Sequence, residues 1–162
     1  MDMVIKELHA WLKTQNALPT KPKWKRTFMD ITGITRLENR WSDIYLFFFN
    51  QNESHGLRDL FIRCLEKVAG IPENWIEEFS VCREWATSES KRIDLLIKDE
   101  ERGKAVIIEN KVYHTLNNDL SHYYKEVKQK EYSDIKGIVL SLYKLAVSDP
   151  HYIFSPQTSD NP

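Results

Sequence analysis

The alternation of apolar and charged positions is clearest over residues 92–111, where two apolar runs flank a charged loop. The runs are Ile93–Ile97 and Ala105–Ile108. Two apolar runs joined by a short polar segment that contains glycine are typical of a β-hairpin. The pattern therefore predicts strands over residues 92–99 and 104–112.

The register of this hairpin can be worked out from its loop. If Asp99 pairs with Lys104, Asp94 lies directly opposite Glu109, and opposed residues share a face with Cβ atoms about 5 Å apart. Lys111 lies two residues beyond Glu109 and shares that face. Two carboxylates this close repel each other, and a divalent cation between them favours both ionised forms. Because these ligand atoms are all oxygen, the pattern favours Mg²⁺ or Mn²⁺ over Zn²⁺.

Periodicity predicts the other elements. Apolar residues recur at helical spacing in segments 3–14, 34–50, 57–69 and 118–130. Alternation or short apolar runs predict strands over residues 79–87, 137–142 and 151–154. The sequence therefore predicts mixed α/β structure.

Two of the predicted helices have an inward stripe that can be named. In segment 34–50 the stripe is Leu37, Trp41, Ile44, Tyr45 and Phe48, and in segment 57–69 it is Leu57, Leu60, Phe61, Cys64, Leu65 and Val68. Glu38 lies beside the first stripe, so it can reach inward from the helix edge. Taken alone, Glu38 is equally explained as a first-turn acid that the helix dipole favours.

Length and composition predict one main domain. The chain has 162 residues and a net charge of −1, so bulk charge does not indicate nucleic-acid binding and any phosphate contact must be local. No apolar leader or membrane span is visible, which predicts a cytoplasmic protein without membrane contact. The predicted division is an N-terminal helix and basic connector (1–27), the main domain (28–154) and a disordered tail (155–162).

The acidic hairpin, with Asp94 in one strand and Glu109-x-Lys111 ending the next, resembles the PD-(D/E)XK nuclease superfamily; Ile93 stands where the superfamily's name has proline. A longer set of motifs is similar to a subgroup of this superfamily found in bacteria. These motifs are Glu38-x-x-Trp41-Ser42, His55-Gly56, Arg92-Ile93-Asp94, Ile108-Glu109-Asn110-Lys111 and Leu120-x-x-Tyr123-Tyr124. The likeness covers about residues 28–143.

The resemblance implies a restriction-endonuclease-like α/β sandwich, with a mixed central sheet flanked by helices in the order helix-helix-strand-strand-strand-helix-strand. It also implies an endonuclease or exonuclease that hydrolyses phosphodiester bonds, in DNA rather than RNA, with Mg²⁺ or Mn²⁺ as cofactor. Nucleic acid is the implied partner, and assembly as a homodimer is allowed.

The same resemblance implies roles for individual residues. Asp94 and Glu109 would bind the metal, helped by the carbonyl oxygen of Asn110 and by Glu38 through a water. Lys111 would orient the attacking water or stabilise the developing negative charge. Together, Glu38, Asp94, Glu109 and Lys111 form the expected catalytic set.

Four further residues are expected near the nucleic-acid backbone: Lys91, Arg92, Arg83 and His122. Asp119 stands where the subgroup often has glutamine, and its carboxylate is expected to repel phosphate.

Two other functions stay open. One is a catalytically silent module of the same fold that binds nucleic acid or a protein partner, although a silent scaffold has no reason to keep two buried acids. The other is a glycosidase that uses Asp94 and Glu109 as its acid/base pair, since a separation near 5 Å suits a retaining mechanism. In that reaction Lys111 has no obvious task.

Overall fold

The computed structural model describes residues 28–35, 37–111, 119–141 and 149–156, without the side chains of 154–156. The chain divides into two compact units, residues 1–33 and 34–162. In the first unit the structure describes a short helix, α2 (Phe28–Thr32), which the sequence did not predict. The predicted helix over residues 3–14 and the basic connector lie outside the described residues. The predicted domain boundaries stay a prediction.

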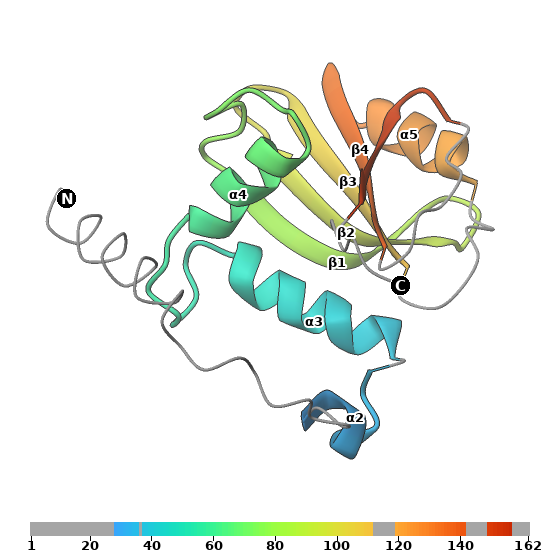
Figure 1. Cartoon of the computed structure of the whole chain (residues 1–162). Helices are drawn as coiled ribbons and strands as arrows, with labels where there is room; N and C mark the ends of the chain where they lie inside the picture. The colour runs from blue at the N-terminus through green and yellow to red at the C-terminus, as the bar shows by residue number, and fades with distance from the viewer. Residues whose placement is uncertain (1–27, 36, 112–118, 142–148, 157–162) are drawn as a thin grey trace, which may run out of the picture. The chain divides into compact units, whose positions relative to one another are not determined.

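The second unit is built on a five-stranded mixed sheet (Figure 1). Its strands lie in chain order: β1 (Ser80–Ala86), β2 (Arg92–Asp99), β3 (Lys104–Lys111), β4 (Asp134–Ser141) and β5 (Tyr152–Pro156). β1, β2 and β3 pair antiparallel, whereas β3, β4 and β5 pair parallel. The change of direction falls at β3, the strand that carries Glu109 and Lys111.

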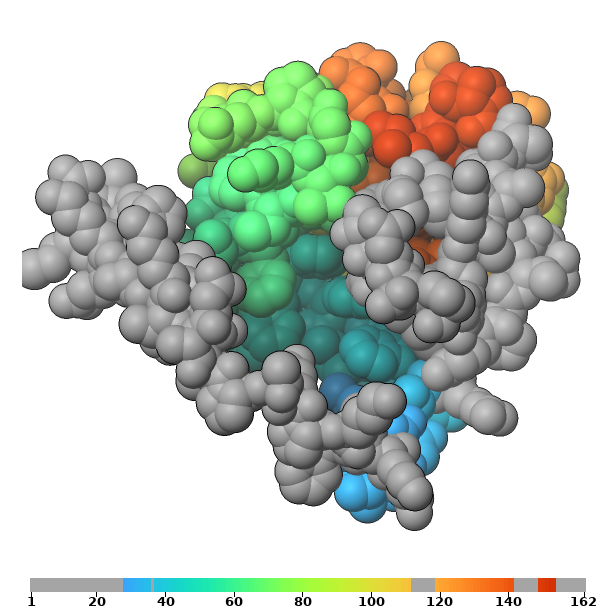
Figure 2. Space-filling model, viewed as in Figure 1, coloured from blue at the N-terminus to red at the C-terminus, as the bar shows by residue number. Residues whose placement is uncertain are grey.

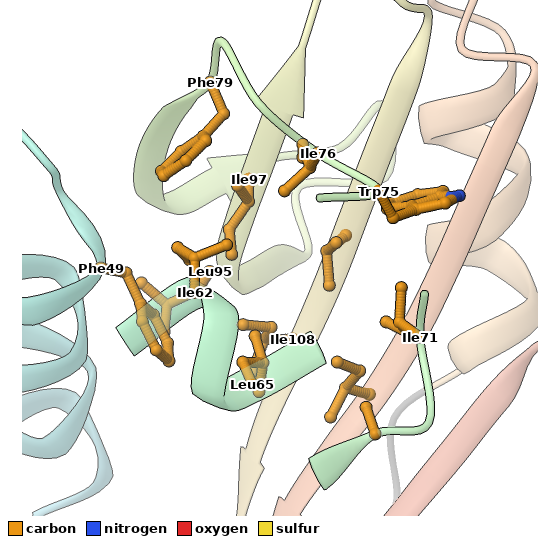
Figure 3. Close-up of a cluster of buried hydrophobic side chains, with 13 residues drawn as sticks. Phe49, Ile62, Leu65, Ile71, Trp75, Ile76, Phe79, Leu95, Ile97 and Ile108 are labelled. Atoms are coloured by element: carbon orange, nitrogen blue, oxygen red, sulfur yellow. The ribbon is translucent and has the colours of Figure 1, made fainter. Parts of the chain in front are cut away.

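Helices cover both faces of this sheet (Figure 1). α3 (Glu38–Phe49) and α4 (Leu60–Val68) contribute to one apolar cluster, drawn in Figure 3, and α5 (Leu120–Lys128) contributes to the other. Along β3, Val106 and Ile108 join the first cluster, while Ala105 and Ile107 join the second. A strand buried on both faces in this way reads as a nearly continuous apolar run.

The predicted α/β sandwich is confirmed. After α2, the elements follow the predicted order of two helices, three strands, a helix and a strand, with β5 as the predicted edge strand. β5 runs to Pro156, past the predicted strand end at 154, and residues 157–162 lie outside the described part of the chain. Among the described residues, no helix combines the length and apolarity that crossing a membrane requires.

The predicted hairpin register is also confirmed, because Asp99 pairs with Lys104 across the loop. The Asp99 carboxylate is fully buried and accepts hydrogen bonds from the backbone N–H groups of Arg102 (3.1 Å) and Glu77 (3.1 Å). Gly103 has φ +61°, a conformation that glycine adopts without strain. Local turn chemistry therefore sets the register of the whole hairpin.

The predicted inward stripe of α3 is confirmed in part, because Tyr45 packs against the first apolar cluster, but the most buried side of the helix is rotated slightly from it. Leu37 is exposed, whereas Ser42 and Phe49 are buried. Glu38 lies at helical spacing from both buried residues and is mostly covered. α3 has apolar or aromatic residues on most of its sides, so the sequence does not define one inward face. Packing against the sheet places the side that carries Glu38 inward.

The predicted inward stripe of α4 is also confirmed only in part, for a different reason. Leu57, Leu60, Cys64 and Val68 are exposed, and the α4 segment forms part of the surface seen in Figure 2. Of the predicted stripe, Leu65 is buried and Phe61 packs against the first apolar cluster; the other buried positions of α4 are Ile62 and Glu66.

A polar network sets the orientation of α4. Glu66 is buried, pairs with Arg63 (2.7 Å) and accepts hydrogen bonds from the backbone N–H groups of Asn74 and Ile76 (both 3.1 Å). A carboxylate can be buried when it is paired and hydrogen-bonded in this way. The partners of Glu66 therefore hold this residue on the buried side of α4, although it is not part of the apolar stripe.

Candidate active site

The end of the hairpin opposite its loop brings together side chains from three elements. The β2–β3 register pairs Leu95 with Ile108, so one step further places Asp94 opposite Glu109. The backbone N–H of Asn110 donates to the Asp94 carboxylate (2.7 Å), and the Asn110 side-chain amide donates to the carbonyl oxygen of Glu38 (3.2 Å). Asn110 therefore ties the start of α3 to both strands.

Lys111 lies between two carboxylates from different layers of the sandwich. Its Nζ atom is 2.8 Å from Oε1 of Glu109 and 3.5 Å from Oε2 of Glu38. Burial lowers the pKa of Lys111, but the combined effect of Glu109, Glu38 and Asp94 outweighs burial and raises the pKa overall. The ammonium group is therefore charged at neutral pH and held in place.

Glu109 is the most unusual side chain of the cluster. It is fully buried, and neither carboxylate oxygen accepts a hydrogen bond of good geometry from the residues that the structure describes, although Oε1 lies at ion-pair distance from Lys111. Burial raises the pKa of Glu109 to about 7, with a further contribution from the charge of Asp94. Burial also raises the pKa of Asp94, against the hydrogen bond from Asn110.

These residues fit a hard divalent cation. Buried polar atoms normally have hydrogen-bond partners, so two carboxylate oxygens that have none among the described residues, beside the half-buried Asp94, need an explanation. Among the described residues, no three His, Cys, Asp or Glu side chains lie close enough together to hold a metal. Mg²⁺ needs only one or two protein carboxylates because it keeps several waters, so Asp94 and Glu109 suffice.

Sequence reasoning missed a further acid, Glu84 in β1. Arg83 pairs with Leu95 and Trp85 with Ile93, so Glu84 falls opposite Asp94. Acidic side chains therefore occur at matching positions of three neighbouring strands. Glu84 has φ +53°, which is uncommon for a residue other than glycine. Its carboxylate lies 3.0 Å from the Arg92 guanidinium. The sequence did show that Glu84 is an acid within the predicted strand 79–87. Its position opposite Asp94 became visible only from the β1–β2 register.

The four residues expected near a nucleic-acid backbone all face carboxylates. Arg83 pairs with Asp43 and, at 3.7 Å, with Glu84, which also holds Arg92.

The remaining two share a single acid. Lys91 lies 2.8 Å from Glu89, and Nδ1 of His122 lies 3.6 Å from the same carboxylate. Glu89 and Lys91 are exposed, so this pair adds little stability and a phosphate can displace it. Arg83 and Arg92 therefore lie beside the candidate site through Glu84, whereas Lys91 and His122 form a second basic group around Glu89.

Asp119 has a local structural task. Its carboxylate accepts a hydrogen bond from the backbone N–H of His122 (3.0 Å) and caps the N-terminus of α5. The aspartate at this position is thus explained by helix capping. Its expected repulsion of phosphate stays a prediction.

Comparison with known proteins agrees with this arrangement. A family model described as the PD-(D/E)XK nuclease superfamily matches residues 27–156. No curated protein and no solved structure matches the chain.

Proposed function

The chain belongs to the PD-(D/E)XK nuclease superfamily, and on that basis we propose that it is a metal-dependent nuclease that hydrolyses phosphodiester bonds in DNA. The observation that carries the proposal is the orphaned, fully buried Glu109 carboxylate beside Asp94 and Lys111. Family membership points to nuclease activity and a nucleic-acid substrate. DNA as the substrate, and Mg²⁺ or Mn²⁺ as the cofactor, are our inference.

In the proposed site Asp94 and Glu109 hold the cation, with the Asn110 carbonyl oxygen and a water-mediated contact from Glu38. When bound, the cation lowers the pKa of a coordinated water and offsets negative charge on the phosphate. Lys111 contributes a fixed positive charge for the charge that develops on the reacting phosphate oxygens. Glu38 orients Lys111 from the α3 side.

The protonation state of Glu109 couples the site to pH. A carboxyl group with a pKa of about 7 is half protonated at neutral pH. Binding of a cation requires the ionised form, so it displaces this proton. Cation affinity in the proposed site therefore rises as pH increases through 7.

The proposed DNA backbone lies along the basic groups around the site. Arg83 and Arg92 carry planar, permanently charged guanidinium groups, which suit bidentate contact with phosphate. Both now share Glu84, and DNA phosphates would compete for them. A cytoplasmic location, a bacterial source and assembly as a homodimer remain predictions from the sequence.

Incubation of the protein with plasmid DNA, single-stranded DNA and RNA, with and without Mg²⁺ or Mn²⁺, tests the proposal. We expect cleavage of DNA that stops with EDTA and falls at least about a hundredfold in Asp94→Asn. Glu101→Gln, which removes an exposed acid from the hairpin loop, is the matched control and should cleave normally.

The rival function is a silent module that binds nucleic acid without cutting it. In that case, wild type and Asp94→Asn would bind the same DNA equally and neither would cleave it with any divalent cation. That result would overturn the proposed activity and leave the fold assignment untouched.

A further inference from the structure

A cavity of about 380 Å³ lies between strands β1 and β2 on one side and the C-terminal end of α5 on the other. Its lining includes two aromatic residues, two lysines and two aliphatic residues: Trp85, Tyr132, Lys98, Lys130, Leu96 and Val127. The aliphatic pair is buried, whereas the aromatic rings are half-buried. The volume falls in the range of roughly 300–1,000 Å³ that holds small ligands.

The charge of this cavity favours an anion. In the part of the chain that the structure describes, its lining carries two lysines and no carboxylate. Lys98 pairs with Glu100 at 3.1 Å, but the Glu100 side chain is 71% exposed, so the pair is weak and can be displaced. Glu126, which lies near Lys130, is already held by the Ser88 hydroxyl (2.6 Å) and backbone N–H (3.0 Å).

The cavity adjoins the candidate active site. Leu96 lies two residues from Asp94 on the same strand, which corresponds to about 7 Å along β2. Trp85 pairs across the sheet with Ile93, the neighbour of Asp94. A strand of nucleic acid with one phosphate at the acidic cluster could therefore place a nearby nucleotide in this cavity.

We propose that the cavity binds a single nucleotide of the nucleic-acid substrate, with its base stacked against Trp85 and Tyr132 and its phosphate held by Lys98 and Lys130. Aromatic rings bind every base through its flat face, so the site accepts nucleotides without strong sequence preference. This inference rests on the proposed nuclease function, because that function supplies the class of ligand. It identifies a substrate contact outside the acidic cluster.

The test uses the full chain labelled with 5-fluorotryptophan, in EDTA so that no cleavage occurs. The ¹⁹F signal of Trp85 is assigned with Trp85→Phe, and the labelled protein is titrated with deoxyadenosine 5′-monophosphate. We expect a saturable shift of the Trp85 signal. Deoxyadenosine alone and inorganic phosphate alone should each shift it less at equal concentration.

Charge variants separate this site from general attraction to a basic surface. The double variant Lys98→Gln/Lys130→Gln should bind the nucleotide about tenfold more weakly, as expected for the loss of a charge-assisted contact. Lys128→Gln is the matched control, since Lys128 lies on α5 over the Tyr124 ring and outside the cavity. An unmoved Trp85 signal, or equal binding by the double variant and the control, would overturn the inference.

A parallel assay of single-stranded DNA cleavage with Mn²⁺ keeps the two proposals apart. Cleavage without any nucleotide-dependent shift of Trp85 would reject the cavity and support the nuclease. A saturable shift without cleavage would support the nucleotide site and reject the nuclease activity.

Discussion

Two buried carboxylates at opposite ends of the same hairpin behave differently. Asp99, beside the loop, is fully buried and accepts hydrogen bonds from two backbone N–H groups. Glu109, at the other end, is equally buried, but among the described residues its oxygens accept no hydrogen bond of good geometry and have the Lys111 ammonium at ion-pair distance. The first acid stabilises the turn, whereas the second costs stability until a ligand compensates it. Hydrogen bonding, not burial, therefore distinguishes the structural acid from the candidate functional one.

The largest expected effect is on activity. Glu109→Gln removes the charge needed to hold a cation, and we expect metal-dependent DNA cleavage to fall at least about a hundredfold. Binding of Mn²⁺, measured by calorimetry, should be lost in parallel. Glu101→Gln serves as the control of equal charge change, and unaltered Mn²⁺ affinity in Glu109→Gln would remove Glu109 from the site.

The second prediction concerns pH in the absence of metal. The pKa of Glu109 is raised from 4.5 in the unfolded chain to about 7 in the folded protein, so the folded state keeps a proton that the unfolded state loses. Protonated Glu109 makes its full contribution to the free energy of unfolding below pH 4.5. This contribution is lost as pH rises to 7, and the loss approaches about 3 kcal/mol.

Denaturant unfolding in EDTA between pH 5 and pH 8 measures this effect. Glu109→Gln should flatten the decline, because the amide does not titrate. If the free energy of unfolding changed with pH by the same amount in the wild type and in Glu109→Gln, the raised pKa assigned to Glu109 would be wrong.

The third prediction concerns the satisfied acid. Asp99→Asn replaces a carboxylate that accepts two backbone hydrogen bonds, and we expect a loss of about 2 kcal/mol in the free energy of unfolding. The loss should be similar with and without divalent cations. If stability were unchanged while Mn²⁺ binding fell, the roles assigned to Asp99 and Glu109 would have to be exchanged.

The smallest effect concerns a second orphaned group. The Tyr152 hydroxyl is buried and has no hydrogen-bond partner within residues 28–35, 37–111, 119–141 and 149–156, and burial raises the pKa of this phenol, with a further contribution from the charge of Glu109. Tyr152→Phe removes the orphaned oxygen but keeps the ring that packs over Gly137. We expect a gain of about 1 kcal/mol in the free energy of unfolding, measured by denaturant titration. A clear loss of stability would show that the hydroxyl has a partner in solution.

Local patterns were sufficient to predict much of the fold. The strand boundaries of 92–99 agree with β2, and the Asp99–Lys104 pair set the register that brings Asp94 opposite Glu109. Both features depend on side-chain alternation and on a short loop, which neighbouring residues control. The same alternation placed Lys111 beside Glu109.

Helix orientation could not be predicted in the same way. α3 has apolar or aromatic residues on most sides, so its sequence allowed several inward faces, and the one with Ser42 and Phe49 is buried. α4 was turned by Glu66, whose partners at Asn74 and Ile76 follow the helix. The position of Glu84 opposite Asp94 likewise depended on a strand pair that the sequence did not specify.

The sequence by itself determined which acids and which lysine are available, and how they are spaced along two neighbouring strands. Only the tertiary structure decided which of those acids are satisfied, because the partners come from other segments of the chain. The backbone N–H of Glu77, before β1, reaches Asp99, whereas in the described part of the chain no backbone N–H donates to Glu109, which has the Lys111 ammonium beside it. Desolvation without a hydrogen-bond partner is a property of the folded surroundings, and spacing along the chain does not reveal it.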